Sequence, residues 1–342
     1  MELNNYILSE DVQAIILLTA NIGKKESVQP LTLKEYNAVA KWLSENNLRP
    51  KSIFDDNVLQ RIRDSHNNKI DVNRIDQLLD RGGKLALTLE KWFNQGLWIL
   101  SRIDEKYPGR IKKHLGNSSP PVLYGAGNKD LLDNGGLAVV GSRTPDGKAL
   151  QFTQRISGMC AKEDIQIISG GAKGIDREAM ITVDKHGGEY TGVLAGGLAK
   201  EALSGLYRNA MRDGRGVLIS PFNPDAGFTV GNAMSRNKYI YTLADWAVVV
   251  SSSENKGGTR AGAIENMNKK WTPLFVRYGD DIPAGNTSLV EKGAHTLSLQ
   301  DIGSHGTLRE TLENIQRKGE KDAAAGNEQP DVQLTLFEES IV

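Results

Sequence analysis

The stretch LAVVGSRTPDGKALQFTQRISGMCAKEDIQIISGGAKGIDREAM, residues 137–180, predicts two strands that are each followed by a turn and a helix. Residues 137–140 are a continuous apolar run, which a parallel strand needs when helices cover both faces of its sheet. Apolar residues then recur at helical spacing, and the chain returns in a second strand at 165–169. The stretch therefore predicts a βαβ unit at the centre of the fold.

The turn after the second strand has the composition of an anion site. Residues 169–174, Ser-Gly-Gly-Ala-Lys-Gly, stand directly before a helix that we expect to begin at Ile175. Glycines let backbone N–H groups approach an anion, the helix N-terminus adds a partial positive charge, and Lys173 adds a full one. Similar turns also occur in sheets that bind nothing there, so this turn alone leaves both interpretations open.

Four further strands are predicted after this unit, at 190–194, 216–220, 245–250 and 272–277, with helical stretches between them. Such alternation predicts a doubly wound, mostly parallel sheet with right-handed crossovers. The segment 95–136 contains short apolar pieces broken by prolines, and we expect it to add an edge to this sheet.

Three strand ends of this sheet are chemically alike, and in such sheets ligands gather at the carboxyl ends of the strands. They are 141–143, 169–174 and 251–260, where a glycine-rich turn opens a helix. The start of another helix, near 235–240, adds further positive charge. We call the edge of the sheet formed by these strand ends the rim. The cations that we expect on the rim are Arg143, Lys173, Arg236 and Lys238, with Lys256 and Arg260 as further candidates.

No pair of carboxylates accompanies these cations in an arrangement suited to acid–base chemistry. Asp176, at the expected start of a helix, is interpreted as an N-terminal cap rather than as a general base. The rim is therefore predicted to bind phosphate without performing chemistry on it.

The composition excludes several other classes of protein. The 342 residues have a formal net charge of zero, so any nucleic-acid surface must be a local patch. The N-terminus has no leader pattern and no run is apolar enough to span a membrane, so we expect a cytoplasmic protein. Cys160 is the one cysteine and the five histidines are scattered, so we expect no disulfide, no metal and no cofactor.

The chain divides into four parts. Residues 1–94 have helical patterns and form a module whose role the residues leave open between protein docking and DNA contact, with a solvated face as the simpler interpretation of its mixed charges. Residues 95–290 form the sheet domain, and 291–318 form an extension. Residues 319–342 are too polar to bury a core, and we expect a disordered tail.

The ordered motifs between residues 96 and 278 resemble those of the DNA-processing protein A family, known as DprA or Smf. The resemblance rests on Tyr107-Pro108, Pro120-Pro121, Gly127-Asn128, Val140 to Arg143, Ser169 to Asp176, Arg236-Asn237 and Gly258-Thr259. It implies an extended Rossmann-like fold that binds single-stranded DNA, forms a homodimer and helps to load the RecA recombinase.

The resemblance and the rim together name the residues that we expect to contact DNA phosphates. The chain departs from the family pattern at Met180, Pro221 and Ala233-Met234, and no winged-helix segment is evident after Arg277, so we interpret it as a divergent member. The DNA-contacting candidates are Gly141, Ser142, Arg143, Ser169, Gly170, Gly171, Lys173, Gly174, Arg236, Asn237, Lys238, Gly258 and Thr259.

The acidic tail ends with an apolar peptide, Gln333-Leu334-Thr335-Leu336-Phe337. It looks like the motif by which bacterial DNA enzymes dock on the replication sliding clamp, with Gln333 as a polar anchor and Leu334, Leu336 and Phe337 as the apolar part. The alternative is that these apolar residues pack back on the domain as a short final strand or helix.

Two other functions fit parts of the same sequence. Gly257-Gly258-Thr259 followed by Glu265 resembles nucleotide-cleaving relatives of the fold, in which a glutamate acts on the glycosidic bond. A sensor that binds a nucleotide signal in the same rim is the second alternative. The interpretation that we prefer is a binder of single-stranded DNA that is not an enzyme.

Overall fold

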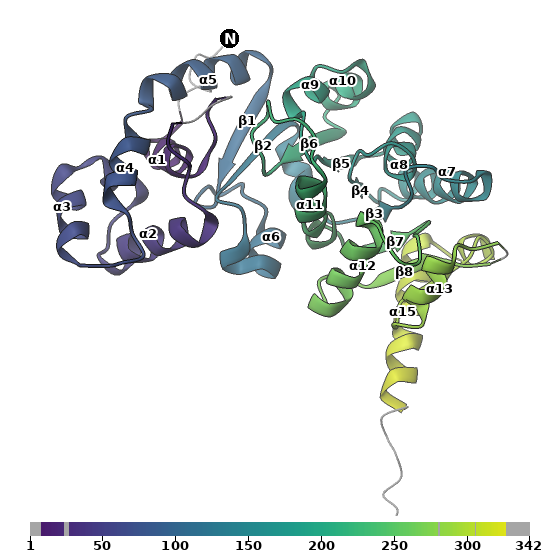
Figure 1. Cartoon of the computed structure of the whole chain (residues 1–342). Coiled ribbons are helices and arrows are strands. Elements are labelled where there is room, and N and C mark those ends of the chain that lie inside the picture. Colours follow the sequence, from purple (N-terminus) through teal and green to yellow (C-terminus); the bar gives the residue numbers. More distant parts are fainter. Residues whose placement is uncertain (1–7, 24–26, 280, 305, 326–342) are drawn as a thin grey trace, which may run out of the picture.

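The computed structural model describes residues 8–23, 27–279, 281–304 and 306–325, which are organised around a nine-stranded sheet (Figure 1). The strand order is β1-β2-β6-β5-β4-β3-β7-β8-β9. The strands are β1 Leu97–Ser101, β2 Val122–Gly127, β3 Leu137–Val140, β4 Ile167–Ser169, β5 Tyr190–Val193, β6 Gly216–Ser220, β7 Trp246–Val249, β8 Leu274–Arg277 and β9 His295–Leu297.

Every strand predicted from an apolar run is present. β3 and β6 have the predicted bounds, while β4, β5, β7 and β8 are one or two residues shorter than predicted. β3 pairs in parallel with β4 on one side and with β7 on the other, so the crossovers lead away from β3 in both directions. The prediction of a doubly wound, mostly parallel sheet is confirmed.

The segment 95–136 adds an edge to the sheet, as predicted. β2 pairs antiparallel with β6, and β1 pairs antiparallel with β2. Two antiparallel pairings in succession restore the original direction, so β1 runs the same way as the parallel strands. Ser101, at the end of β1, therefore lies at the same edge of the sheet as the carboxyl ends of β3 and β7.

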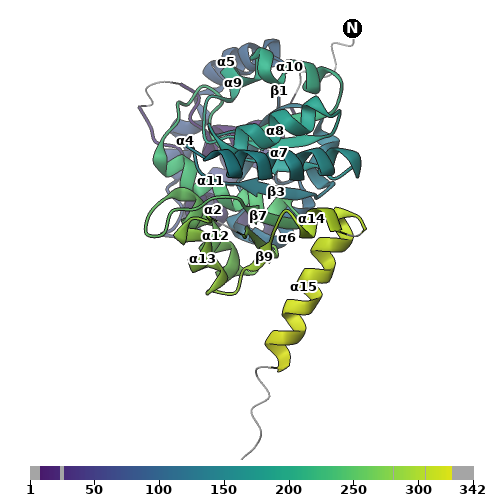
Figure 2. The ribbon, with the colours of Figure 1, turned by 90° about the vertical axis from the view of Figure 1, so that its right-hand side faces the viewer.

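Helices cover both faces of the sheet and enclose two separate cores. Leu137 and Val139 belong to one core and Ala138 and Val140 to the other, because successive side chains of a strand point to opposite faces. Figure 2 shows α7 and α8 side by side on the first face. The first face carries α7 Gly147–Lys162, α8 Ile175–Lys185, α9 Leu198–Ala202 and α10 Gly205–Arg212; the second carries α6 Gly109–Leu115, α11 Val230–Leu243, α12 Gly258–Lys269 and α13 Ala284–Val290.

The N-terminal module is helical, as predicted, and packs against the β1 end of the sheet (Figure 1). Thr32 and Glu35 form a capping box that starts its second helix. Asp225, in the loop after β6, accepts hydrogen bonds from Lys91 Nζ (2.7 Å) and Trp92 Nε1 (3.0 Å). The helices of the module are α1 Glu10–Thr19, α2 Leu33–Glu45, η2 Pro50–Phe54, α3 Asp56–Asp64, α4 Val72–Leu79 and α5 Gly82–Asn94.

The segment 291–318, which the sequence predicted to be an extension, adds a strand to the sheet and packs against its core. After β9 and α14 (Asp301–Ser304), helix α15 runs over Leu308–Ala325 and extends away from the body (Figures 1 and 2). Leu308 and Leu312 at its start are fully buried in the core. The expectation of a tail without structure from residue 319 is wrong for 319–325, which are helical. The peptide Gln333–Phe337 lies outside the described residues.

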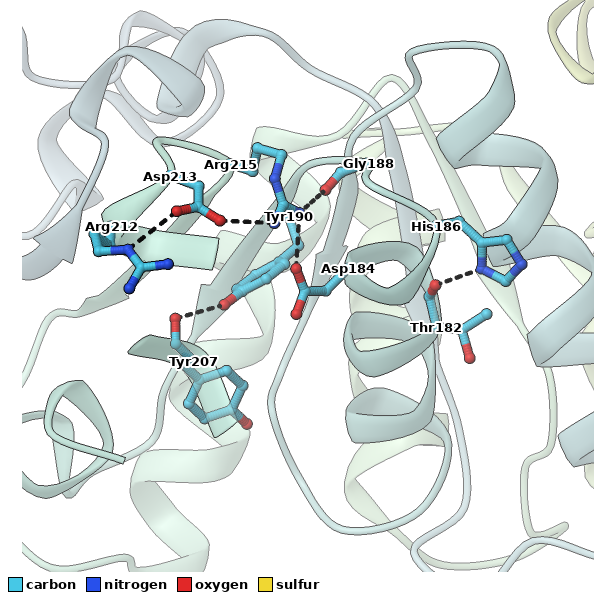
Figure 3. A network of polar contacts seen from close by, with 9 residues as sticks. All are labelled: Thr182, Asp184, His186, Gly188, Tyr190, Tyr207, Arg212, Asp213 and Arg215. Atoms are coloured by element: carbon cyan, nitrogen blue, oxygen red, sulfur yellow. Dashed lines mark hydrogen bonds and ion pairs between the residues drawn. The ribbon is translucent and has the colours of Figure 1, made fainter. Parts of the chain in front are cut away.

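A polar network holds α8, β5 and α10 together at the opposite edge of the sheet from the rim (Figure 3). Arg215 donates to Asp184 (2.7 Å) and also pairs with Asp213 (3.3 Å). Tyr190 donates its hydroxyl to the carbonyl of Tyr207 (3.5 Å). These contacts lie where α8 leads into β5 and α10 leads into β6. They therefore stabilise the sheet at its amino edge, where we expect no ligand.

Candidate nucleic-acid interface

A cavity of about 640 Å³ lies where the carboxyl ends of β3 and β7 meet. This is the position in the sheet at which the strand order reverses, and the loops diverge there to leave a crevice. Its walls come from the turns that follow β3, β4 and β7, from α11 and from the first turn of α12. The lining includes Gly141, Ser142, Arg143, Ala172, Asp176, Val230, Met234, Arg236, Asn237, Ser251, Ser253, Lys256, Gly258 and Thr259.

A buried pair of opposite charges forms the floor of this cavity. Asp176 is 7% exposed and Arg236 is 3% exposed. Arg236 Nη1 donates to the carbonyl of Val193 at the end of β5 (2.7 Å), while its Nε has no hydrogen-bond partner in the described part of the chain. Burial lowers the pKa of Arg236, and the charge of Asp176 opposes that shift. Arg236 is therefore held beneath the surface rather than displayed on it.

The interpretation of Asp176 as a helix cap is wrong. Gly174, with φ of 93°, occupies the cap position of α8, and no side chain caps this helix. Asp176 instead accepts the N–H of Gly141 (3.3 Å) and is hydrogen-bonded by the backbone of Gly170. Burial raises its pKa to about 6, although Arg236 and these hydrogen bonds lower it. One carboxylate thus connects the turns after β3 and β4.

Three other candidates from the sequence also bind neighbouring loops. Ser169 is buried and donates its hydroxyl to the carbonyl of Val139 (2.6 Å). Asn237 Nδ2 donates to the carbonyl of Gly258 (2.9 Å), and Thr259 Oγ1 donates to the carbonyl of Gly141 (3.1 Å). These hydrogen bonds fix the middle of α11 against the first turn of α12, and that turn against the end of β3.

Two glycines in these turns permit close contacts between loops. A Cβ on Gly174 would lie 2.3 Å from the carbonyl oxygen of Ser142, and a Cβ on Gly141 would lie 2.7 Å from Ile175 Cγ1. The turn 169–174 is therefore pressed against the turn after β3. The sequence predicted that glycines here would let a ligand approach; in this structure they let another loop approach.

The cations of the rim are exposed to different degrees. Arg143 and Lys256 are exposed and line the cavity. Lys173 is exposed on the adjoining turn, outside the set of residues that line the cavity. Lys238 is half-buried outside that set as well, where burial lowers its pKa and the charge of Glu265 opposes the shift. Glu265, the glutamate of the enzymatic alternative, is exposed on α12 and is not among the described lining residues.

An apolar group that the sequence analysis did not single out borders the cavity. Phe228, Val230 and Met234 are 52%, 68% and 48% exposed, in the loop after β6 and the start of α11. The guanidinium carbon of Arg143 lies 4.8 Å from the centre of the Phe228 ring. The sequence around Phe228 has no strand or helix periodicity, so no local pattern indicated a role for it. Its role becomes visible only when the fold places it beside Arg143.

Known proteins share the sequence pattern and the fold of this chain. Residues 98–305 match the family model described as DNA recombination-mediator protein A, which is more than half of the chain. The chain belongs to this family. The predicted resemblance is confirmed.

Individual relatives agree with this assignment. The DNA processing protein DprA of Bacillus subtilis is 27% identical over 241 residues, which cover 67% of this chain and 77% of that protein. A putative DNA processing protein DprA of Mycobacterium tuberculosis is 30% identical over 185 residues, 52% of this chain and 45% of that one. The protein Smf of Synechocystis is 30% identical over 203 residues, 56% of this chain and 48% of that one.

Two solved structures share the fold. DNA processing protein A from Streptococcus pneumoniae superimposes with a TM-score of 0.62 at 21% identity, over 88% of this chain and 98% of that one. DNA processing protein A from Helicobacter pylori, solved in a study of its single-stranded DNA binding mode, gives 0.50 at 23% identity, over 66% and 96% of the two chains.

Neither a membrane span nor a metal centre is found in the described part of the chain. Among the described helices, none combines the length and the apolar character that crossing a bilayer requires. The described residues also contain no cluster of three or more histidine, cysteine, aspartate or glutamate side chains arranged to hold a metal ion.

Proposed function

We propose that this protein binds single-stranded DNA along the carboxyl edge of its sheet. The observation that carries the proposal is the cavity between β3 and β7, with Arg143 and Lys256 exposed on its walls and Phe228 beside Arg143. Single strands are held by cations that follow the phosphates and by flat side chains on which bases stack. A duplex keeps its bases paired and stacked, so it cannot use the aromatic contact.

The buried residues of the site have a supporting part in this proposal. Asp176, Arg236 and Asn237 hold the loops in place, and Arg143, Lys173 and Lys256 approach the phosphates. Arg236 also adds its positive charge from below without a direct contact. The family assignment and the single-stranded DNA binding of the Helicobacter pylori relative support the choice of ligand.

The test is a titration of labelled single strands, duplexes and free nucleotides at several salt concentrations. Binding of the strand should weaken as salt rises, by a slope of about 0.7 for each phosphate contact on logarithmic axes. Arg143→Ala and Lys173→Ala should each lower the slope and the affinity. Lys185→Ala, an exposed lysine at the end of α8 on the opposite edge, is the matched control. Equal affinity of the wild type and both rim variants would refute the proposal.

The enzymatic alternative makes a different prediction for the same samples. If Glu265 cleaved a glycosidic bond, free nucleotide would be consumed by the wild type and not by Glu265→Ala. We propose that no turnover occurs, because Glu265 stands outside the cavity lining. A nucleotide sensor would instead bind free nucleotide tightly and release the strand in competition.

We also propose that the bound strand is passed to the RecA recombinase and that the protein acts as a homodimer in the cytoplasm. The family description as a recombination mediator supports the first part. Sedimentation of the purified protein would give the mass of the dimer, and strand exchange by RecA should begin sooner in its presence. A monomeric mass would refute the homodimer. An unchanged lag of strand exchange would refute the transfer to RecA.

The peptide Gln333–Phe337 carries a separate proposal, docking on the replication sliding clamp. Its support is the sequence pattern alone, a polar anchor followed by three apolar side chains in an acidic segment. Deleting residues 333–337 should abolish clamp binding and leave strand affinity intact. Unchanged association with the clamp would refute this proposal.

A further inference from the structure

The N-terminal module forms a groove of about 1000 Å³ together with the segment that follows β1. One wall is α2, with Lys34 and Lys41, and Lys69 from the loop before α4 joins it. The other wall comes from the sheet domain and includes Arg102 and Asn117. Residues from three separated parts of the sequence thus place four cations around one groove.

Hydrogen bonds hold the two walls of this groove together. Arg102 Nη2 donates to Asn37 Oδ1 (2.7 Å), and Asn37 Nδ2 donates to the carbonyl of Asn117 (2.9 Å). The guanidinium carbon of Arg102 also lies 5.2 Å from the centre of the Tyr36 ring. The groove is therefore a formed feature at the junction of the module and the sheet domain.

Positive charge is concentrated in this groove while the module as a whole is neutral. Residues 1–94 carry 13 Lys and Arg against 13 Asp and Glu. The groove takes three of these lysines and one acid, Glu45, so the remainder holds 10 cations against 12 acids. Among the described residues no carboxylate pairs with Lys34, Lys69 or Arg102. Such segregation is typical of a surface that meets an anionic partner.

The groove opens at the same edge of the sheet as the cavity between β3 and β7. Arg102 directly follows β1, which runs in the direction of the parallel strands. Both sites are thus at carboxyl ends, with β2, β6, β5 and β4 between them.

A basic helix leads into the groove from the sheet domain. Helix α6 packs against α11, and Figure 1 shows it between α2 and α11. It begins beside Asp245 at the start of β7, to which Arg110 is ion-paired (2.8 Å), and it ends towards Asn117 in the groove. Its last turn carries the exposed residues Lys112 and Lys113. Helix α6 therefore starts at the amino edge of the sheet, beside Asp245, and its positively charged last turn leads into the groove.

We infer that the groove is a second contact for the phosphate backbone, so that one single strand reaches along the carboxyl edge of the sheet from the cavity to the N-terminal module. This inference rests on the proposed binding of single-stranded DNA and extends it to longer strands. A short strand fills the cavity alone, and a longer one gains the cations of the groove. The module thereby sets the length of strand at which full affinity is reached.

The test compares a strand of about 6 nucleotides with one of about 20 in the full-length protein, a range that spans the usual site sizes of strand-binding folds. The double variant Lys34→Gln/Lys69→Gln should bind the long strand roughly tenfold more weakly, with the salt slope reduced by about 1.4, because each lost phosphate contact removes about 0.7. Its affinity for the short strand should equal that of the wild type, which also shows that the variant is folded. Lys162→Gln/Lys185→Gln, with the same charge change at the ends of α7 and α8, should leave both affinities unchanged.

The outcomes separate this inference from the proposed function. A wild type that binds neither strand refutes the proposed function. A wild type that binds both strands while the groove variant keeps full affinity for the long one refutes the groove alone. Weaker binding of an acidic protein segment, with strand affinity unchanged, would assign the groove to a protein partner instead and would also overturn the inference.

Discussion

Arg236 shows how a residue of the proposed binding site can lie buried beneath the surface of that site. Its side chain is 3% exposed, and its Nη1 atom occupies the space where Gly170 has no side chain. The sequence predicts the charge of such a residue correctly but cannot show its depth. Burial depends on which loops close over it, and those loops are distant in the chain.

This packing predicts the effect of the smallest possible change at Gly170. In Gly170→Ala the new Cβ would lie 1.8 Å from Arg236 Nη1 and 2.4 Å from Asp176 Oδ2. Arg236 would have to move although it is enclosed on all sides, so we expect a loss of roughly 2–4 kcal/mol in the free energy of unfolding. Urea denaturation measures it. Gly147→Ala, where a Cβ meets nothing within 4 Å, is the control and should cost less than about 0.5 kcal/mol.

Asp176 predicts a pH dependence of stability. Its pKa is raised to about 6 by burial, above the value of about 3.9 for an unfolded chain. Between these values the folded state binds the proton more tightly, so this residue makes the free energy of unfolding fall as pH rises from about 4 to 6, by about 3 kcal/mol in total. Above pH 6 its contribution is flat.

The variant Asp176→Asn tests this assignment because asparagine has no such proton. The difference in unfolding free energy between variant and wild type should change across pH 4–6, in favour of the variant as pH rises, and stay constant above that window. Urea denaturation at intervals of half a pH unit measures this difference. If the unfolding free energies of the wild type and the variant run parallel from pH 4 to 7, the pKa of Asp176 lies outside this range.

At the scale of elements, the strands were predictable and one loop was not. β3 and β6 are continuous apolar runs, and such runs have few alternatives to a buried strand. The loop 221–229 has no periodicity, yet it carries Phe228 to the cavity and Asp225 to the N-terminal module. Its position depends on tertiary contacts with α5, which no local pattern in the sequence records.

Asp225 therefore predicts a coupling between the module and the loop beside the cavity. In Asp225→Ala the indole N–H of Trp92, a fully buried side chain, would lose its acceptor, which costs about 1–3 kcal/mol. Hydrogen exchange should then quicken in both α5 and the loop 221–229. Asp130→Ala, which removes only an exposed ion pair with Lys106, should change stability by less than about 1 kcal/mol and leave both segments protected.

At the scale of the whole molecule, the edge strands decide what the sheet presents to a ligand. The residues of 95–136 predicted an added edge but not its direction, because the pairing of β1 through β2 is a long-range choice. That pairing places Arg102 at the carboxyl edge, the same edge as Arg143 and the cavity. A sequence without net charge can thus place cations from distant segments on one edge of the fold.

The same view of the whole chain shows that the start of α15 is part of the core. Leu308 and Leu312 are fully buried, the N–H of Leu308 is hydrogen-bonded to Glu163 (2.8 Å), and the guanidinium carbon of Arg309 lies 5.2 Å from the centre of the Trp246 ring. Deleting residues 308–342 should therefore lower the free energy of unfolding by roughly 4 kcal/mol, since two buried leucines contribute about 1.5–3 kcal/mol each. Deleting only 326–342 should leave it unchanged. Thermal and urea unfolding of the two truncations measure the difference, and equal stability of both would show that α15 adds nothing to the core.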